Sequence, residues 1–367
     1  MDDDGPLRVA LVGYGLAGEI FHAPLVAATA TMELAAVVTR DAGRRQRAAT
    51  RFPRARLMAS PDEIWADPSQ FDLVVVASPN RTHVQLAREA LKARLAVVVD
   101  KPLSASVADA IELRDAAARA GVPITVFHNR RFDGDFLTVG RLLANGALGP
   151  VHRFESRFER WRPVVDARAW RESSDPLDAG GVLYDLGIHL VDQALVLFGP
   201  VESVYAERRC VRPSALVSDD VFLALAHRRG VISHLWASMV AAEPGPRMRA
   251  SGSAGSYVKF GLDVQEEALR RGLPVYSPGW GSETEERWGR VTTDTGSWPV
   301  PTVAGCYPRF YEMVADALLA GAPMPVVIDD AIAAIGVIEA ARMSAEEHAV
   351  IGTSLTTRPS PPASPNQ

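Results

Sequence analysis

Short apolar runs alternate with stretches of helical periodicity along the first third of the chain. The runs lie at 7–12, 34–38, 72–78, 95–99 and 123–127, with helical patterns such as 81–93 and 104–120 between them. Continuous apolar strands that alternate with helices are typical of a parallel sheet covered on both faces. The pattern therefore predicts an α/β domain over residues 1–127.

From about residue 150 the pattern changes to alternating apolar and polar positions. It is visible at 151–159, 201–208, 221–227 and 230–240. Such alternation predicts an antiparallel sheet with one covered face, and the other face, if apolar, would bind a partner subunit. We expect a C-terminal α+β domain with a large, mostly antiparallel open sheet over residues 128–355.

The remainder of this second half is less regular. Residues 272–303 are rich in Gly, Pro, Ser and Trp without a clear period, which indicates a long excursion near a functional site or an interface. Apolar stripes predict two late helices, at 308–320 and 329–347. The proline and serine content of 356–367 is typical of a disordered tail.

Three glycines follow the first apolar run at once. Gly13, Gly15 and Gly18 have GxGxxG spacing, and a helical pattern at 19–28 follows them. In this order Gly13 allows a tight turn, Gly15 lets the backbone approach a pyrophosphate, and Gly18 lets the helix pack on the strand. The order predicts a Rossmann domain that holds a dinucleotide at the helix N-terminus. The alternative is a glycine-rich turn in a cofactor-free domain. The expected cofactor contacts are Gly13, Tyr14, Gly15, Leu16 and Ala17.

The end of the second strand bears on the choice between NADP and NAD. An acid there would accept from the ribose 2′-hydroxyl of NAD, but this strand ends in Thr39 and Arg40. A hydroxyl and a cation suit the 2′-phosphate of NADP. Asp41 would favour NAD if the strand ended later and placed this acid at the ribose.

Polar residues also follow two later strands. They are Ser78, Pro79, Asn80 and His83 after one strand, and Lys101 after the next. The carboxyl ends of parallel strands are where ligands bind in open α/β sheets, so we expect cofactor contacts there. Pro102 restricts Lys101 to an extended or turn backbone, which would aim the lysine at the cofactor crevice. The alternative is a surface lysine in a loop.

The composition indicates a protein that acts on a small molecule. The net charge of −5 offers no attraction to nucleic acid or to an anionic membrane, and no apolar run approaches the length of a membrane span. The opening MDDDGPL is acidic where a signal peptide would be basic, so we expect a cytoplasmic location. Cys210 and Cys306 lack a CxxC pattern and suggest neither a disulfide nor a zinc site.

The stretch GGVLYDLGIH, residues 180–189, combines an acid and a histidine at helical spacing. If the stretch is helical from about Leu183, Asp185 and His189 leave the same face of the helix. We expect Gly180 and Gly181 to allow close backbone approach and Gly187 to clear space between the two side chains. The alternatives are a solvated or packed pair, or two metal ligands, which would lack a third ligand nearby in sequence.

Together these motifs resemble the glucose-fructose oxidoreductase, inositol dehydrogenase and rhizopine catabolism (Gfo/Idh/MocA) family. The motifs that support this resemblance are GxGxxG, the acid-Lys-Pro triplet at 100–102, and GG-x-x-x-D-x-G-x-H at 180–189. The segments 13–25, 128–139, 184–195 and 255–269 resemble its NADP-dependent scyllo-inositol dehydrogenase branch. Two departures from the family pattern are Asp100 in place of Glu and Ala179 in place of the first of three glycines.

The resemblance implies a two-domain enzyme, a homodimer or homotetramer, that transfers hydride between NADP, or NAD, and a sugar or cyclitol carbon. It implies that Trp170 and Arg171 contact cofactor or substrate; the alternative is a stacked pair at the edge of the core. A non-catalytic sensor of the same fold is the rival function, although intact Lys101, Asp185 and His189 favour an enzyme.

Oxidation of a secondary alcohol needs a base near the hydroxyl, and the ordinary pKa of histidine suits His189 to that task. Asp185 would orient the imidazole or bind a substrate hydroxyl, and Lys101 would stabilise the forming alkoxide. His22 and Asn129 are further candidate substrate contacts. A packed histidine is the alternative for His22, and one arginine of the pair 130–131 is expected to be structural.

Overall fold

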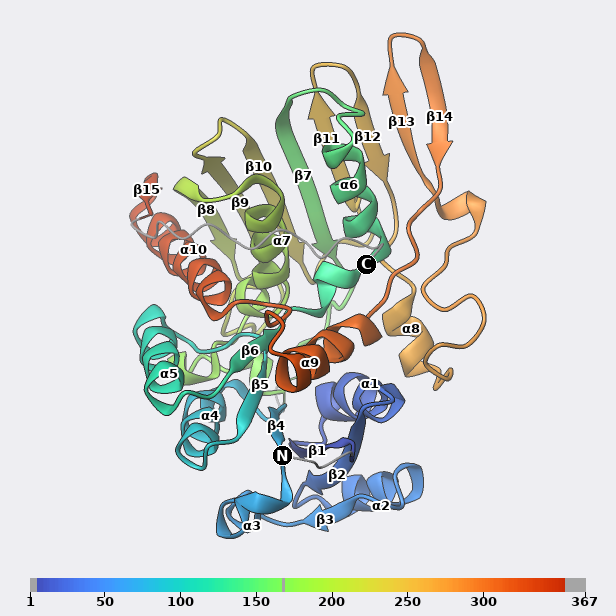
Figure 1. Ribbon diagram of the computed structural model, residues 1–367. Helices are drawn as coiled ribbons and strands as arrows, with labels where there is room; N and C mark the ends of the chain where they lie inside the picture. The colour runs from blue at the N-terminus through green and yellow to red at the C-terminus, as the bar shows by residue number, and fades with distance from the viewer. Residues whose placement is uncertain (1–4, 167–168, 354–367) are drawn as a thin grey trace.

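The computed structural model describes residues 5–166 and 169–353 and contains two large sheets (Figure 1). The first has six strands in the order β3-β2-β1-β4-β5-β6, and the second has nine in the order β14-β13-β12-β11-β7-β10-β9-β8-β15. The tail expected at 356–367 lies outside the described residues.

The first sheet is parallel throughout, as the apolar runs predict. Its strands are β1 (Leu7–Val12), β2 (Met32–Val38), β3 (Arg56–Met58), β4 (Leu73–Val76), β5 (Ala96–Asp100) and β6 (Ile124–Phe127). Its helices are α1 (Ala23–Ala28), α2 (Ala42–Arg51), α3 (Asp62–Ala66), α4 (His83–Lys92) and α5 (Val107–Ala120). The central strands are buried because helices cover both faces, and this confirms the Rossmann fold. No apolar run in the sequence marks the short edge strand β3.

The second sheet is mostly antiparallel, as expected, with one parallel pairing between β7 and β10. Its strands are β7 (Val151–Glu159), β8 (Val201–Arg209), β9 (Asp220–His227), β10 (Ile232–Ser238), β11 (Met248–Gly252), β12 (Ser256–Lys259), β13 (Gly289–Thr293), β14 (Gly296–Val300) and β15 (Ile351–Gly352). Along β9 buried and half-buried residues alternate, so one face of the sheet is covered and the other is not.

The remaining helices are α6 (Gly134–Ala144), α7 (Ile188–Phe198), α8 (Gln265–Arg270), α9 (Pro308–Ala320) and α10 (Ile328–Glu347). In Figure 1 α6, α7 and α10 lie over one face of the second sheet. The two late helices are confirmed. The expectation of an aperiodic excursion over 272–303 was wrong for its last part, where β13 and β14 form an edge hairpin.

One helical stretch, Pro176–Phe198, is long and apolar enough to cross a membrane by length and composition, so the expectation that no such run exists was wrong on that criterion. Its most apolar window is 83% buried inside the protein. That burial is the property of a core helix.

The strand β6 and the start of α5 meet α10 and the segment that leads into it, and hydrogen bonds fix this junction. Thr125 on β6 donates its hydroxyl to the carbonyl of Val326, and the carboxylate of Glu339 on α10 accepts from the backbone amide of Val107. The last residues of β5 and β6, Asp100 and Phe127, line a cleft together with residues of the second part of the chain.

Candidate active site

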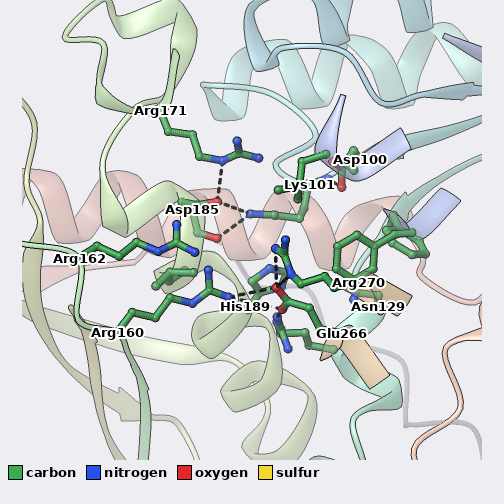
Figure 2. A pocket seen from close by; sticks show the side chains of 16 residues that line it. Asp100, Lys101, Asn129, Arg160, Arg162, Arg171, Asp185, His189, Glu266 and Arg270 are labelled. Atoms are coloured by element: carbon green, nitrogen blue, oxygen red, sulfur yellow. Dashed lines mark hydrogen bonds and ion pairs between the residues drawn. The ribbon is translucent and has the colours of Figure 1, made fainter. Parts of the chain in front are cut away.

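A cleft between the two sheets gathers residues from both halves of the chain (Figure 2). Its polar lining comprises Asp100, Lys101, Asn129, Arg130, Arg160, Arg162, Arg171, Asp185, His189, Glu266 and Arg270, and its apolar lining comprises Leu16, Ala17, Phe21, Phe127 and Leu186. The structure thus brings Lys101, Asp185 and His189 to one cavity, together with Asn129.

Lys101 extends from the end of β5 to Asp185. Its Nζ donates to the carboxylate Oδ1 of Asp185 at 2.9 Å and to the backbone carbonyl of the same residue at 2.6 Å. An ammonium group has three N–H donors, and two are engaged in these bonds. The third remains for a ligand oxygen in the cleft.

Asp185 is held as a carboxylate by two cations. Burial opposes its ionisation, but Lys101 and Arg171 outweigh burial and hold the pKa of Asp185 well below its usual range. The Nε of Arg171 donates to Asp185 Oδ1 at 3.2 Å. Because Asp185 bonds to Lys101 and Arg171, no hydrogen bond joins it to His189 among the described residues, and the expectation that it orients the imidazole is replaced by a role in holding Lys101.

Asp185 and His189 lie on one helical stretch, as the spacing predicts. A π-helical turn, Leu183–Gly187, leads directly into α7, and such wide turns are frequent at functional sites. His189 is 5% exposed and its Nδ1 has no hydrogen-bond partner among the described residues. Burial first, and then the positive charge of Lys101 and Arg130, lower the pKa of His189 well below its usual value. The imidazole is therefore neutral at neutral pH and can accept a proton.

The glycines of this stretch have different roles. A Cβ on Gly180 would overlap the carbonyl oxygen of Ser173, so the close backbone approach predicted there is confirmed. A Cβ on Gly187 would instead meet the side chain of Leu183 at 3.2 Å. The expectation that Gly187 clears space between Asp185 and His189 was wrong, because this position faces the core.

A second cavity lies at the ends of β2 and β4. The predicted cofactor residues that line it are Gly13, Thr39, Arg40, Ser78 and Pro79. Asp41 lines it too, but its carboxylate accepts from the backbone amide of Arg44 at 2.7 Å and caps α2. Arg40 is exposed beside it.

The glycine turn fits a dinucleotide. Gly13 has φ +101°, and a Cβ there would lie 2.6 Å from the carbonyl oxygen of Ala77, so no other residue fits. A Cβ on Gly15 would meet nothing nearer than Arg44 Nη1 at 3.9 Å, which leaves room for a phosphate group beside a guanidinium. Leu16 and Ala17 continue the turn into the first cleft.

Besides Gly15, five predicted site residues line neither cavity. His22 is fully buried, with Nδ1 2.6 Å from the Tyr311 hydroxyl and its ring against Phe127. The expectation that His22 contacts substrate is corrected to a packed histidine. Tyr14 is also buried, at 1% exposure, so its side chain fills the core.

The other three hold loops or a neighbouring side chain. Asn80 donates to the carbonyl of Asp178 at 2.9 Å, and the ring nitrogens of His83 lie 2.8 Å and 2.9 Å from the carbonyls of Pro102 and Ser78. These side chains fix the loops at the strand ends and line neither cavity, whereas a direct contact with the cofactor was expected of them. Trp170 stacks under the Arg171 guanidinium at 4.3 Å, so only the arginine reaches the cleft.

Sequence reasoning missed four charged residues of the cleft. Arg160 and Arg162 follow the end of β7, and Glu266 and Arg270 lie on α8. The arginine-rich segment RFERWR was the available signal, but it belongs to no motif of fixed spacing. Of the pair 130–131, Arg130 lines the cleft, whereas Arg131 is buried in ion pairs with Asp192 and Asp330.

In the described ranges, 5–166 and 169–353, no group of three or more His, Cys, Asp or Glu side chains is placed to hold a metal ion. Cys210 and Cys306 are both free thiols.

Two family models match the chain. Residues 7–128 match the oxidoreductase family model with an NAD-binding Rossmann fold, and residues 136–258 match the GFO/IDH/MocA C-terminal domain. The oxidoreductase YdgJ of Escherichia coli is 40% identical over 350 residues, covering 94% of this chain and 98% of its own.

The scyllo-inositol 2-dehydrogenase (NADP(+)) IolW of Bacillus subtilis is 34% identical over 349 residues, covering 94% of this chain and 95% of its own. Among solved structures, the yvaA oxidoreductase of Bacillus subtilis superimposes with a TM-score of 0.91 at 33% identity, covering 96% of this chain and all of that one.

Proposed function

The chain belongs to the Gfo/Idh/MocA family of oxidoreductases, and from this premise we propose that it oxidises a secondary alcohol of a cyclitol or sugar with NADP, or reduces the corresponding ketone with NADPH. As a member with an NAD-binding Rossmann domain, it is an NAD(P)-dependent oxidoreductase. The identity of the substrate and of the catalytic residues is our proposal. The observation that chiefly supports this proposal is the contact between Lys101 and Asp185 at the cleft.

In the proposed reaction each side chain has one task. When bound, the nicotinamide takes up or returns the hydride. The free N–H of Lys101 donates to the reacting oxygen and stabilises it as negative charge develops. Neutral His189 accepts the hydroxyl proton in the oxidation direction, and Asp185 keeps Lys101 aimed at the oxygen.

NADP is proposed over NAD because Arg40 is exposed at the end of β2, while the carboxylate of Asp41 is engaged in capping α2. A guanidinium is a partner for a 2′-phosphate, and a carboxylate already bonded to a backbone amide is less available to a ribose hydroxyl. The NADP dependence in the name of the relative IolW supports the same choice.

We also propose that the uncovered face of the second sheet joins two copies of the chain. The aromatic side chains of Phe222 and Trp236 pack together on this face, with ring centroids 5.1 Å apart, and Ile232 is 38% exposed. Light scattering of the purified protein tests this proposal, and a monomer at micromolar concentration would contradict it.

A panel of inositols and aldoses, assayed with NADP and with NAD separately, tests the function. We expect reduced nicotinamide to form with at least one polyol, with a higher kcat/KM for NADP. scyllo-Inositol is the first compound to test because a relative is named for it. A flat absorbance trace across the panel would favour a non-catalytic sensor.

A further inference from the structure

The cleft carries more positive charge than its carboxylates balance. Its lining includes six cations, Lys101, Arg130, Arg160, Arg162, Arg171 and Arg270, and three carboxylates, Asp100, Asp185 and Glu266. His189 adds no charge because it is neutral. Asp133, which pairs with Arg130 at 3.3 Å from outside this lining, offsets one of these charges, so a surplus of two positive charges surrounds the space where the substrate of the proposed function binds.

The carboxylates are shared among several cations. Asp185 forms ion pairs with Lys101 and Arg171. Glu266 forms ion pairs with three arginines: Arg130 at 2.6 Å, Arg160 at 3.4 Å and Arg270 at 2.8 Å. The guanidinium of Arg162 has no hydrogen bond or ion pair with any residue in the described part of the chain. Arg162 nevertheless points into the cleft (Figure 2).

The arginines also repel one another. Burial lowers the pKa of Arg160, Glu266 opposes this effect, and the neighbouring cations Arg130 and Arg162 lower the pKa further. A cluster of like charges in a partly buried site raises the free energy of the empty site. An anion bound between the arginines would remove this repulsion.

The glycine turn and the cavity beside Arg40 would hold the phosphates of the cofactor. Arg160 and Arg162 come from the segment after β7, and in Figure 2 they lie on the side of Asp185 away from Lys101 and Asp100. The two arginines therefore face the substrate rather than the dinucleotide.

We infer that the preferred substrate is a polyol that carries an acidic group, a carboxylate or a phosphate, which binds Arg160 and Arg162 while the reacting hydroxyl lies at Lys101 and His189. This inference rests on the proposed function for the position of the hydroxyl. Charge-assisted bonds from guanidinium to an oxyanion are strong and orient the ligand, so they also select among hydroxyls. Neutral inositols and aldoses would be slower substrates.

Binding is the first test because it needs no turnover. The enzyme with NADP bound is titrated by calorimetry with glucose, gluconate and glucose 6-phosphate. We expect the acidic ligands to bind at least tenfold more tightly than glucose, and the two acids distinguish a carboxylate site from a phosphate site. Equal affinity of all three compounds would overturn the inference.

A pair of variants localises the effect. Arg162→Gln should reduce the acid preference about tenfold, the loss of one charge-assisted contact, without raising the KM for NADP. Arg229→Gln, an exposed position in the turn between β9 and β10, makes the same charge change far from the cleft and should keep the preference. A higher KM for NADP in Arg162→Gln would assign the arginine to the cofactor and overturn the inference.

Turnover separates this inference from the proposed function. kcat/KM is measured for matched neutral and acidic pairs, myo-inositol with its 1-phosphate and glucose with gluconate. Turnover of neutral members at rates equal to the acidic ones would contradict the inference and leave the proposed function standing. Tight acid binding without any turnover would contradict the proposed function and leave the anion site standing.

Discussion

Lys101 donates both to the side chain and to the backbone carbonyl of Asp185, at 2.9 Å and 2.6 Å, and this contact joins the end of β5 to the helix of the second part of the chain. The lysine is 14% exposed and the acid 17% exposed, so the pair is largely removed from water. The two halves of the chain thus meet at the point where the proposed chemistry takes place.

Asp185→Asn should destabilise the fold at pH 7 by about 3 kcal/mol, because it leaves two cations without their carboxylate. The pKa of Asp185 is lowered by folding, so its contribution is complete above the ordinary pKa of 3.8 and is lost as the pH falls below it. Urea unfolding at pH 7 and near pH 3 should show a difference from wild type that narrows in acid. Asp175→Asn, in a half-exposed pair with Arg81, should cost less than about 1 kcal/mol at pH 7, and an equal cost for both variants would contradict the account.

The pH profile tests His189. Because burial and neighbouring cations lower its pKa, the imidazole stays neutral well below pH 6.5, and the acid limb of kcat/KM for alcohol oxidation should lie below that value. His189→Asn should remove this limb and slow turnover by about 10² to 10⁴. A limb that is unchanged in the variant would place the base elsewhere.

Arg40→Ala should raise the KM for NADP about tenfold and leave the KM for NAD nearly unchanged, because only NADP carries the 2′-phosphate. Steady-state kinetics with both cofactors measure the effect, and Arg54→Ala, exposed between α2 and β3, is the matched control. Equal losses with NADP and NAD would show that Arg40 does not contact that phosphate.

Two glycines of the same motif should respond differently to alanine. Gly180→Ala places a methyl group on the carbonyl of Ser173 and should lower the melting temperature and the activity together. Gly187→Ala meets the end of the Leu183 side chain at 3.2 Å and the carbonyl oxygen of Val182 at an ordinary 3.7 Å, and it gains helix propensity, so the melting temperature of this variant should change little. Thermal unfolding of both variants measures the two melting temperatures. An equal fall in melting temperature for the two variants would contradict the packing described for Gly180 and Gly187.

The sequence predicted the first sheet well because every central strand is apolar on both faces and lies next to a helix of clear period. It missed β3, which has only three residues, one of them buried. The hairpin β13–β14 was also missed, since its second strand is mostly exposed and shows no alternation. Edge strands carry little of the burial pattern on which such reasoning depends.

For the site, the resemblance of the motifs around Lys101, Asp185 and His189 to the family pattern identified these three residues, which the fold brings to one cleft. The sequence reasoning missed four charged residues of the cleft, Arg160, Arg162, Glu266 and Arg270. Their proximity depends on where the fold places the end of β7 and α8, and no local motif encodes this. His22 was misplaced for a related reason. Its sequence position next to the glycine turn does not reveal that its ring turns toward Tyr311 and Phe127.

The turnover of Lys101→Met on an oxidisable polyol with NADP tests the central claim most directly. The account predicts a fall in kcat of about 10² to 10³, with the affinity for NADP nearly unchanged, since the lysine stabilises charge on the reacting oxygen. Lys92→Met, which removes an exposed lysine paired with Glu89, should behave as wild type. Near wild-type turnover in Lys101→Met would contradict the claim that this lysine and Asp185 form the catalytic contact.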